Sequence, residues 1–93
     1  MERVTDNAEQ HRYEITLDDE LVGFSQYRDH DGVRDILHTE VFEGWEGRGL
    51  GTRLLEGALT DIRSRGLRLK ATCPMLVAYL GKHPEERDLL GAV

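Results

Sequence analysis

The spacing of apolar and polar residues predicts strands in the first half of the chain. In RYEITL, residues 12–17, Tyr13, Ile15 and Leu17 alternate with polar positions. Such alternation is typical of a strand with one buried face. Further strands are predicted over residues 21–27 and 33–42, with polar turns between them, and Gly32 permits the positive φ that the second turn needs. We therefore expect three consecutive antiparallel strands.

The second half changes to a helical period. After residue 53, apolar residues recur at helical spacing and Gly66 is placed to end the helix; the repeating residues are Leu54, Leu55, Ala58, Leu59 and Ile62. Residues 67–72 alternate again, and a strand reached through a helix should run parallel to the preceding strand. Pro74 suits the first turn of a second helix, which should end before Pro84.

These elements predict an α/β (α+β) fold, with a mixed, mostly antiparallel sheet, one parallel strand pair and two helices. A chain of 93 residues is sufficient for one domain with a modest core. Residues 1–10 show no periodicity, so we expect a disordered tail there and a single folded domain over residues 11–93.

Composition narrows the function classes. The chain has 18 acidic and 12 basic side chains, a net charge of -6, which argues against nucleic acid as a partner and favours a basic acceptor such as an amine. It has no apolar run long enough to span a membrane and no signal-peptide core near Met1, so a cytoplasmic protein without a membrane partner is expected. The histidines are scattered and Cys73 is the single cysteine, so no metal site is expected.

The segment VFEGWEGRGLGTR, residues 41–53, is a candidate phosphate cradle. Its glycines at 44, 47, 49 and 51 allow tight turns that collect N–H groups, and the following helix directs its positive dipole end at the same place. The lysine that a nucleoside triphosphate loop requires is missing after Gly51, and the GxGxG spacing differs from the dinucleotide fingerprint. A pyrophosphate bound outside a doubly wound sheet is the remaining interpretation.

At this point the chain resembles a family. The order of elements, with the segments ILHTEVFEGWEGRGLGTRLLEGAL and KATCPMLVAYLGKHPE, is similar to the GNAT superfamily of N-acetyltransferases. It resembles in particular the small GNAT-like proteins that lack the N-terminal helices and carry a cysteine-proline pair. The resemblance covers about residues 12–90 and implies a minimal GNAT-like fold that binds acetyl-CoA. Glu46 differs from the superfamily's loop pattern, which usually has glutamine or arginine at this position.

The resemblance also implies a cofactor site. Backbone groups near Val41 and Phe42 would bind the pantetheine arm where the third and fourth strands diverge. The pyrophosphate would lie on the backbone donors of the loop, with one nearby cation; these residues are Gly47, Arg48, Gly49, Leu50, Gly51 and Thr52.

Four residues are candidates for the chemistry. Cys73 precedes a helix whose dipole can lower the pKa of a thiol, although a free cysteine is also a common core residue. Tyr79 is in the region where the superfamily often has a tyrosine that protonates the CoA thiolate, but it shares an apolar face with its neighbours. His38 and Glu40 lie on one face of the third strand, where either could be a general base or position the acceptor, and a purely structural role is equally open.

The sequence therefore predicts an acetyl-CoA-dependent N-acetyltransferase that modifies an amine, either a small molecule or a protein lysine. The alternative is a non-catalytic CoA-binding or partner-binding module on the same fold. A monomer or weak homodimer is expected, because a short sheet with a free edge could pair with a second copy without needing to.

Overall fold

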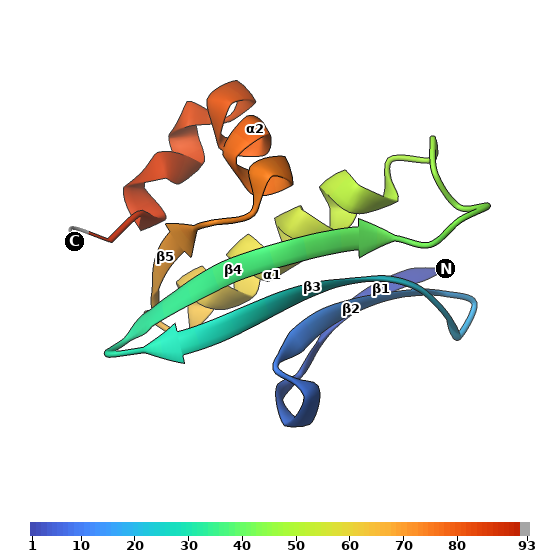
Figure 1. Cartoon of the computed structure of the whole chain (residues 1–93), viewed down its shortest axis with the longest axis horizontal. Coiled ribbons are helices and arrows are strands. Elements are labelled where there is room, and N and C mark those ends of the chain that lie inside the picture. Colours follow the sequence, from blue (N-terminus) through green and yellow to red (C-terminus); the bar gives the residue numbers. More distant parts are fainter. Residues whose placement is uncertain (92–93) are drawn as a thin grey trace.

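Five strands form one sheet in the order in which they occur along the chain (Figure 1). The computed structural model describes residues 1–91. Four strands pair antiparallel, and the fifth runs parallel to the fourth. They are β1 (Glu2–Asn7), β2 (Arg12–Leu17), β3 (Glu20–His30), β4 (Val33–Val41) and β5 (Arg68–Ala71).

Two helices pack against this sheet. Helix α1 (Leu50–Ser64) connects β4 to β5 and crosses one face, behind the strands in Figure 1. Helix α2 (Pro74–Lys82) follows β5 and lies at that end of the sheet, and its buried residues join those of α1 in one core. Short 3-10 helices η1 (Ala8–Gln10) and η2 (Pro84–Leu89) complete the described chain. The predicted fold class, with its single parallel pair and two main helices, is confirmed.

The end of α1 has the local structure that the glycine at position 66 predicted. Gly66 has φ 70°, its N–H donates to the carbonyl of Arg63, and the next N–H, of Leu67, donates to the carbonyl of Ile62. This pair of bonds is a Schellman motif, which needs a residue in the left-handed conformation and therefore favours glycine. The predicted helix stop at Gly66 is confirmed.

The prediction of a disordered tail over residues 1–10 is wrong. Residues 2–7 form β1, which pairs along its whole length with β2. Its inward side chains are Glu2, Val4 and Asp6, so two of the three anchors are charged and the strand has little apolar signal. Glu2 pairs with Arg53 of α1, and a Cβ on Gly57 of α1 would lie 2.7 Å from Val4, so the helix passes very close to β1.

The hairpin between β3 and β4 is tighter than the sequence pattern indicated. Asp29 and His30 lie between the predicted strands over residues 21–27 and 33–42, but in the structure they belong to β3 and pair with Arg34 and Val33. Only Asp31 and Gly32 make the turn, with φ values of 50° and 78°. Two central residues with positive φ match the right-handed twist of a hairpin.

Arg34 is a buried arginine of β4 whose side chain contacts the other antiparallel strands, including the outermost strand β1. The Arg34 side chain is 7% exposed and donates to both carboxylate oxygens of Asp29, at 2.7 and 2.8 Å, and to the hydroxyl of Tyr13 at 2.8 Å. It also pairs with Asp6 of β1 at 3.4 Å and lies 3.9 Å above the ring of Tyr27. Burial of a charge is tolerated only with such partners.

We predict that Arg34→Met lowers the free energy of unfolding by about 3 kcal/mol, because buried carboxylate and hydroxyl groups lose their donor. Urea denaturation measures this change. The matched control is Arg3→Met on the exposed side of β1, which should change the free energy by less than about 0.5 kcal/mol. Equal effects of the two substitutions would contradict the anchoring role of Arg34.

Candidate functional site

The loop between β4 and α1 is a cluster of free backbone donors. Gly44, Gly47 and Gly49 have φ values of 93°, 80° and 75°, which only glycine adopts readily. Within residues 1–91, no group accepts a hydrogen bond from the backbone N–H groups of residues 47–52. Gly49 is the N-cap of α1, and the first turn has no acidic residue. Free donors at the positive end of a helix favour an anion.

The Glu46 side chain faces its own loop. Its carboxylate accepts a hydrogen bond from the backbone N–H of Gly44 at 2.9 Å. The guanidinium of Arg48 lies 4.9 Å above the ring of Trp45, and the N–H of Trp45 donates to the carbonyl of Phe42. Glu46 therefore stabilises the loop and at the same time places a negative charge next to the free donors.

A cavity of about 300 Å³ adjoins this loop. It is lined by Val41 of β4, the loop, the first turn of α1 and Met75 of α2. A Cβ on Gly51 would lie 3.2 Å from the sulfur of Met75 and 3.6 Å from a methyl group of Val41. The absent side chain at Gly51 therefore lets α2 approach the start of α1, which closes one wall of the cavity.

Beside the cavity, β4 has a free edge. Its pairing with β5 covers only residues 33–36, and the carbonyl of Ile36 accepts the next two N–H groups, of Thr72 and Cys73, at 3.1 and 2.9 Å. Further along, the N–H of Phe42 donates to the carbonyl of Val22 in β3 at 2.9 Å. Because antiparallel bonding alternates, the N–H and C=O of Val41 point to the other side, toward the free edge. The expected free donor at Phe42 is thus already used, whereas Val41 offers both groups.

The structure places Cys73 in the core. Its side chain is 2% exposed, and the thiol donates to the hydroxyl of Thr39 at 3.4 Å. Thr39 in turn lies 2.9 Å from the hydroxyl of Ser25. Cys73 is the N-cap residue of α2, and its backbone N–H is bound by Ile36. The thiol therefore holds the start of α2 against β4.

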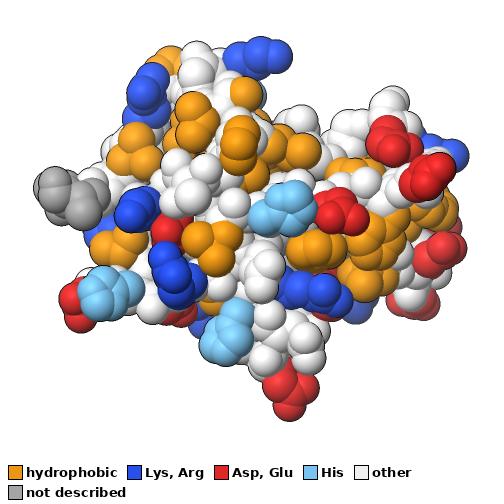
Figure 2. Space-filling model, in the orientation of Figure 1, with side chains coloured by type: hydrophobic (Ala, Val, Ile, Leu, Met, Phe, Trp, Pro, Cys, Tyr) orange, Lys and Arg blue, Asp and Glu red, His pale blue; other side chains and the backbone are white. Residues whose placement is uncertain are grey.

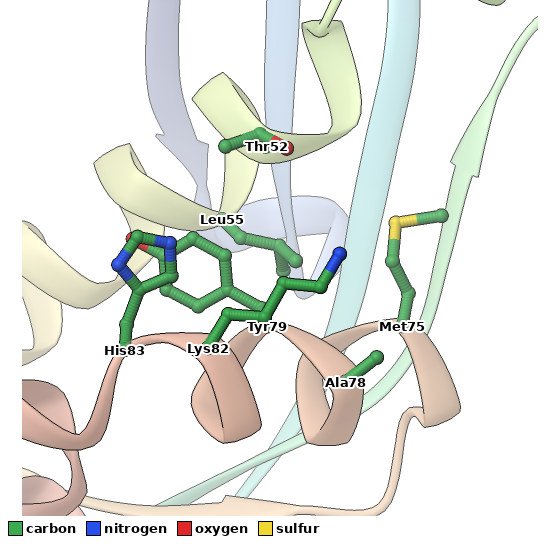
Figure 3. Close-up of a pocket in the computed structure, with 7 residues that line it drawn as sticks. All are labelled: Thr52, Leu55, Met75, Ala78, Tyr79, Lys82 and His83. Carbon is green, nitrogen blue, oxygen red and sulfur yellow. The ribbon is translucent and has the colours of Figure 1, made fainter.

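Tyr79 lies in a second cavity, of about 210 Å³, between α1 and α2 (Figure 3). Its side chain is 8% exposed, and its ring stacks on His83 with 4.2 Å between centroids. The ring points toward His83 and away from Met75. Burial raises the pKa of Tyr79, and the nearby carboxylates of Glu56, Glu86 and Glu85 raise it further. The hydroxyl therefore keeps its proton at neutral pH.

His38 and Glu40 lie on the face of the sheet opposite α1. The His38 ring nitrogen is 3.2 Å from the Glu40 carboxylate, and both side chains are at least half exposed. The ring of Phe24 lies 6.1 Å from that of His38 and 4.9 Å below the guanidinium of Arg12. Figure 2 shows hydrophobic, histidine and acidic side chains side by side on this face. His38 and Glu40 thus lie on the face of the sheet opposite to the cavity that Val41 and Met75 line.

Met75 and Lys82 were not among the predicted site residues, although both line the groove between the helices. Residues 75, 78, 79 and 82 share one helical face, which the spacing could have shown. Of these four residues, only Tyr79 was predicted to belong to the site.

Two searches of the described residues found nothing. No group of three or more His, Cys, Asp or Glu side chains within residues 1–91 is placed to hold a metal ion. None of the helices in this same range is both long and apolar enough to cross a bilayer.

Comparison with known proteins gives a consistent result. A family model described as GCN5-related N-acetyl-transferase matches residues 12–89. The NMR structure of a GCN5-like candidate N-acetyltransferase from Staphylococcus aureus is similar, with a TM-score of 0.72 and 22% identity over 98% of this chain and 89% of that chain. No curated protein sequence matches the chain significantly.

Two crystal structures are similar over part of their length. A candidate acetyltransferase of the GNAT family from Desulfovibrio desulfuricans has a TM-score of 0.56 and 30% identity, over 64% of this chain and 41% of that chain. Ard1 from Thermoplasma volcanium has a TM-score of 0.56 and 24% identity, over 69% of this chain and 45% of that chain. This chain therefore spans less than half the length of either protein.

We predict that Glu46→Gln strengthens the binding of inorganic pyrophosphate about two- to fivefold, because it removes a negative charge beside the free donors but keeps an acceptor for Gly44. Isothermal titration calorimetry at low salt measures this affinity. Glu43→Gln is the control, since Glu43 is in the same loop but does not line the cavity. Unchanged affinity in Glu46→Gln would show that this carboxylate does not act on the anion.

Proposed function

The chain belongs to the GCN5-related N-acetyltransferase family, and we propose that it transfers the acetyl group of acetyl-CoA to an amine. The observation that carries this proposal is the cluster of free N–H groups at residues 47–52, next to a free strand edge at Val41. A pyrophosphate needs the first feature, and the amide groups of a pantetheine arm need the second. Both open into the same cavity.

The loop donors would hold the pyrophosphate. We propose that the backbone of Gly47, Gly49, Leu50, Gly51 and Thr52 donates to its oxygens, with Arg48 as the nearby cation. Arg48 makes no ion pair with any of residues 1–91, so its charge is available. The pantetheine arm would bind the N–H and C=O of Val41. Phe42 follows directly after β4, but its N–H already donates to Val22 and would not bind the arm.

The amine would approach from the face of the sheet that carries His38 and Glu40, opposite to α1. Beyond Ile36, β4 has no β5 neighbour, so groups on its two faces can meet at the free edge. An amine must lose a proton to attack a thioester, and His38 and Glu40 are the proposed groups that bind the ammonium and accept this proton. In the reaction, a carbon–nitrogen bond forms as the carbon–sulfur bond breaks, and the thiolate needs a proton.

Tyr79 is the proposed acid for the thiolate. Its phenol is protonated at neutral pH and therefore has a proton to give to the thiolate. For Cys73 we propose a positioning role, because its buried thiol binds Thr39 and holds the start of α2 beside the free edge. Direct participation of the thiol is the alternative, and the variants below separate the two.

We propose an acceptor that is a small-molecule amine or a protein lysine. The net charge of -6 favours association with a cation and disfavours nucleic acid. We also propose a cytoplasmic protein that is monomeric or weakly dimeric and has no membrane partner.

The first test is calorimetric titration with acetyl-CoA. We expect micromolar binding that is weakened at least about tenfold in Gly49→Glu, because a carboxylate would occupy the cradle. Gly32→Glu is the matched control, since Gly32 also has a positive φ but lies in the β3–β4 turn. A protein that does not bind acetyl-CoA, or two variants that behave alike, would refute the proposed cofactor.

The second test is turnover with a panel of amines, followed by mass spectrometry of the acetylated product. Tyr79→Phe should lower kcat about 100-fold, the usual contribution of a general acid, while the Kd for acetyl-CoA stays within about twofold. Cys73→Ala should change stability more than kcat if the thiol only positions α2. Binding of acetyl-CoA without transfer to any amine would instead support the non-catalytic CoA-binding module.

A further inference from the structure

We propose that the acceptor is a primary monoamine whose nitrogen is attached to an apolar group. Glu40 binds the ammonium of this molecule, and the rings of Phe24 and Phe42 bind its apolar group. This inference rests on the proposed function, in which His38 and Glu40 receive the amine. It goes further because it names the class of amine and disfavours amines that carry a second positive charge.

Three aromatic rings border Glu40 on the face of the sheet opposite α1. Phe24 of β3 is directly opposite Glu40 in the β3–β4 register. His38 precedes Glu40 by two residues and Phe42 follows it by two, a spacing that places side chains of an extended chain on one side. The ring centroid of Phe24 lies 6.1 Å from that of His38 and 6.1 Å from that of Phe42. The carboxylate therefore lies beside an aromatic surface, and Figure 2 shows hydrophobic, histidine and acidic side chains together on this face.

This arrangement suits an ammonium with an apolar substituent. Phe24 already attracts one cation, since the guanidinium of Arg12 lies 4.9 Å from its ring centroid. Among residues 1–91, His38 is the only side chain that bonds the Glu40 carboxylate, at 3.2 Å, and the second carboxylate oxygen accepts no hydrogen bond from them. An ammonium can therefore bind Glu40, while its carbon chain covers apolar ring surface.

Glu40 holds this nitrogen close to the proposed path of the cofactor. It directly precedes Val41, whose N–H and C=O are the proposed contacts of the pantetheine arm, and consecutive strand residues are about 3.3 Å apart. The nitrogen gives one proton to Glu40 or His38 and attacks the thioester carbon, so the products are an N-substituted acetamide and CoA. The second proton that the nitrogen loses balances the proton that Tyr79 gives to the sulfur.

A second carboxylate on this face is already occupied. Glu14 of β2 is directly opposite Phe24, so Glu14, Phe24 and Glu40 form one row across three strands. A diamine could place one ammonium on each carboxylate of such a row. However, the Glu14 carboxylate accepts hydrogen bonds from Arg12 at 2.7 Å and from Asn7 at 3.0 Å, and its side chain is only 17% exposed. A second ammonium would be repelled by the Arg12 guanidinium, so the face favours a monoamine.

The experiment compares pentan-1-amine with pentane-1,5-diamine, which differ only in the second ammonium. We expect the unmodified protein, saturated with acetyl-CoA, to favour the monoamine at least about tenfold in kcat/KM. Phe24→Thr removes the ring but keeps a residue that favours strands, so KM for pentan-1-amine should rise about fivefold while kcat stays within about twofold. Val33→Thr introduces the same residue at the other end of β4 and should leave KM unchanged.

Arg12→Gln tests the occupied carboxylate. Because this variant frees Glu14 for a second ammonium, kcat/KM for the diamine should rise at least about threefold, and that for the monoamine should stay within about twofold. A purely structural effect of Arg12 would lower both values alike, which would contradict the proposed role of the row.

The outcomes separate this inference from the proposed function. Transfer to the diamine, or to a lysine peptide, with a kcat/KM equal to or above that of pentan-1-amine refutes the inference and leaves an N-acetyltransferase in place. An unchanged KM in Phe24→Thr also refutes it, because the ring would then not contact the acceptor. Binding of acetyl-CoA without transfer to any amine refutes both proposals.

Discussion

The early end of the parallel ladder between β4 and β5 determines the rest of the site. Once the carbonyl of Ile36 has accepted the N–H groups of both Thr72 and Cys73, the chain turns into α2 and no fifth-strand residue remains to pair with the end of β4. The backbone of Val41 is left free beside the glycine loop. A longer ladder would pair this edge, separate α2 from α1 and close the passage between the two faces of the sheet.

A domain of this size buries a small core, so polar contacts contribute where apolar area is limited. Arg34 is the main example, because its guanidinium bonds Asp29, Tyr13 and Asp6 while its flat face lies on Tyr27. Burial of the Tyr27 phenol, together with the hydrogen bond that it donates to Asp6, raises the pKa of Tyr27 to about 12. The cluster lies at the far end of β4 from the glycine loop, so stability and ligand binding are served by different parts of one strand.

Elements with a regular apolar period could be predicted from the sequence, and those fixed by distant partners could not. Alternation in residues 12–17 and the helical period ending at Gly66 both correspond to the structure. β1 was missed because Glu2 and Asp6 are held by Arg53 and Arg34, far along the chain. In the candidate site, glycine spacing indicated the free donors, since their conformation is local. The engaged N–H of Phe42, the buried thiol of Cys73 and the groove face of α2 depend on how elements pack, which no short segment encodes.

The charges that hold β1 have a second effect, on contact between molecules. β1 is the outermost strand of the sheet, and an exposed strand edge can accept a strand from another copy. Here the edge carries Glu2 and Asp6 pointing inward and Arg3 pointing outward. A strand added in register would have to desolvate Glu2 and Arg3, which are still partly or fully exposed. The charged residues of β1, which give this segment no apolar pattern, therefore also protect the outer edge of β1 from pairing with a strand of another molecule.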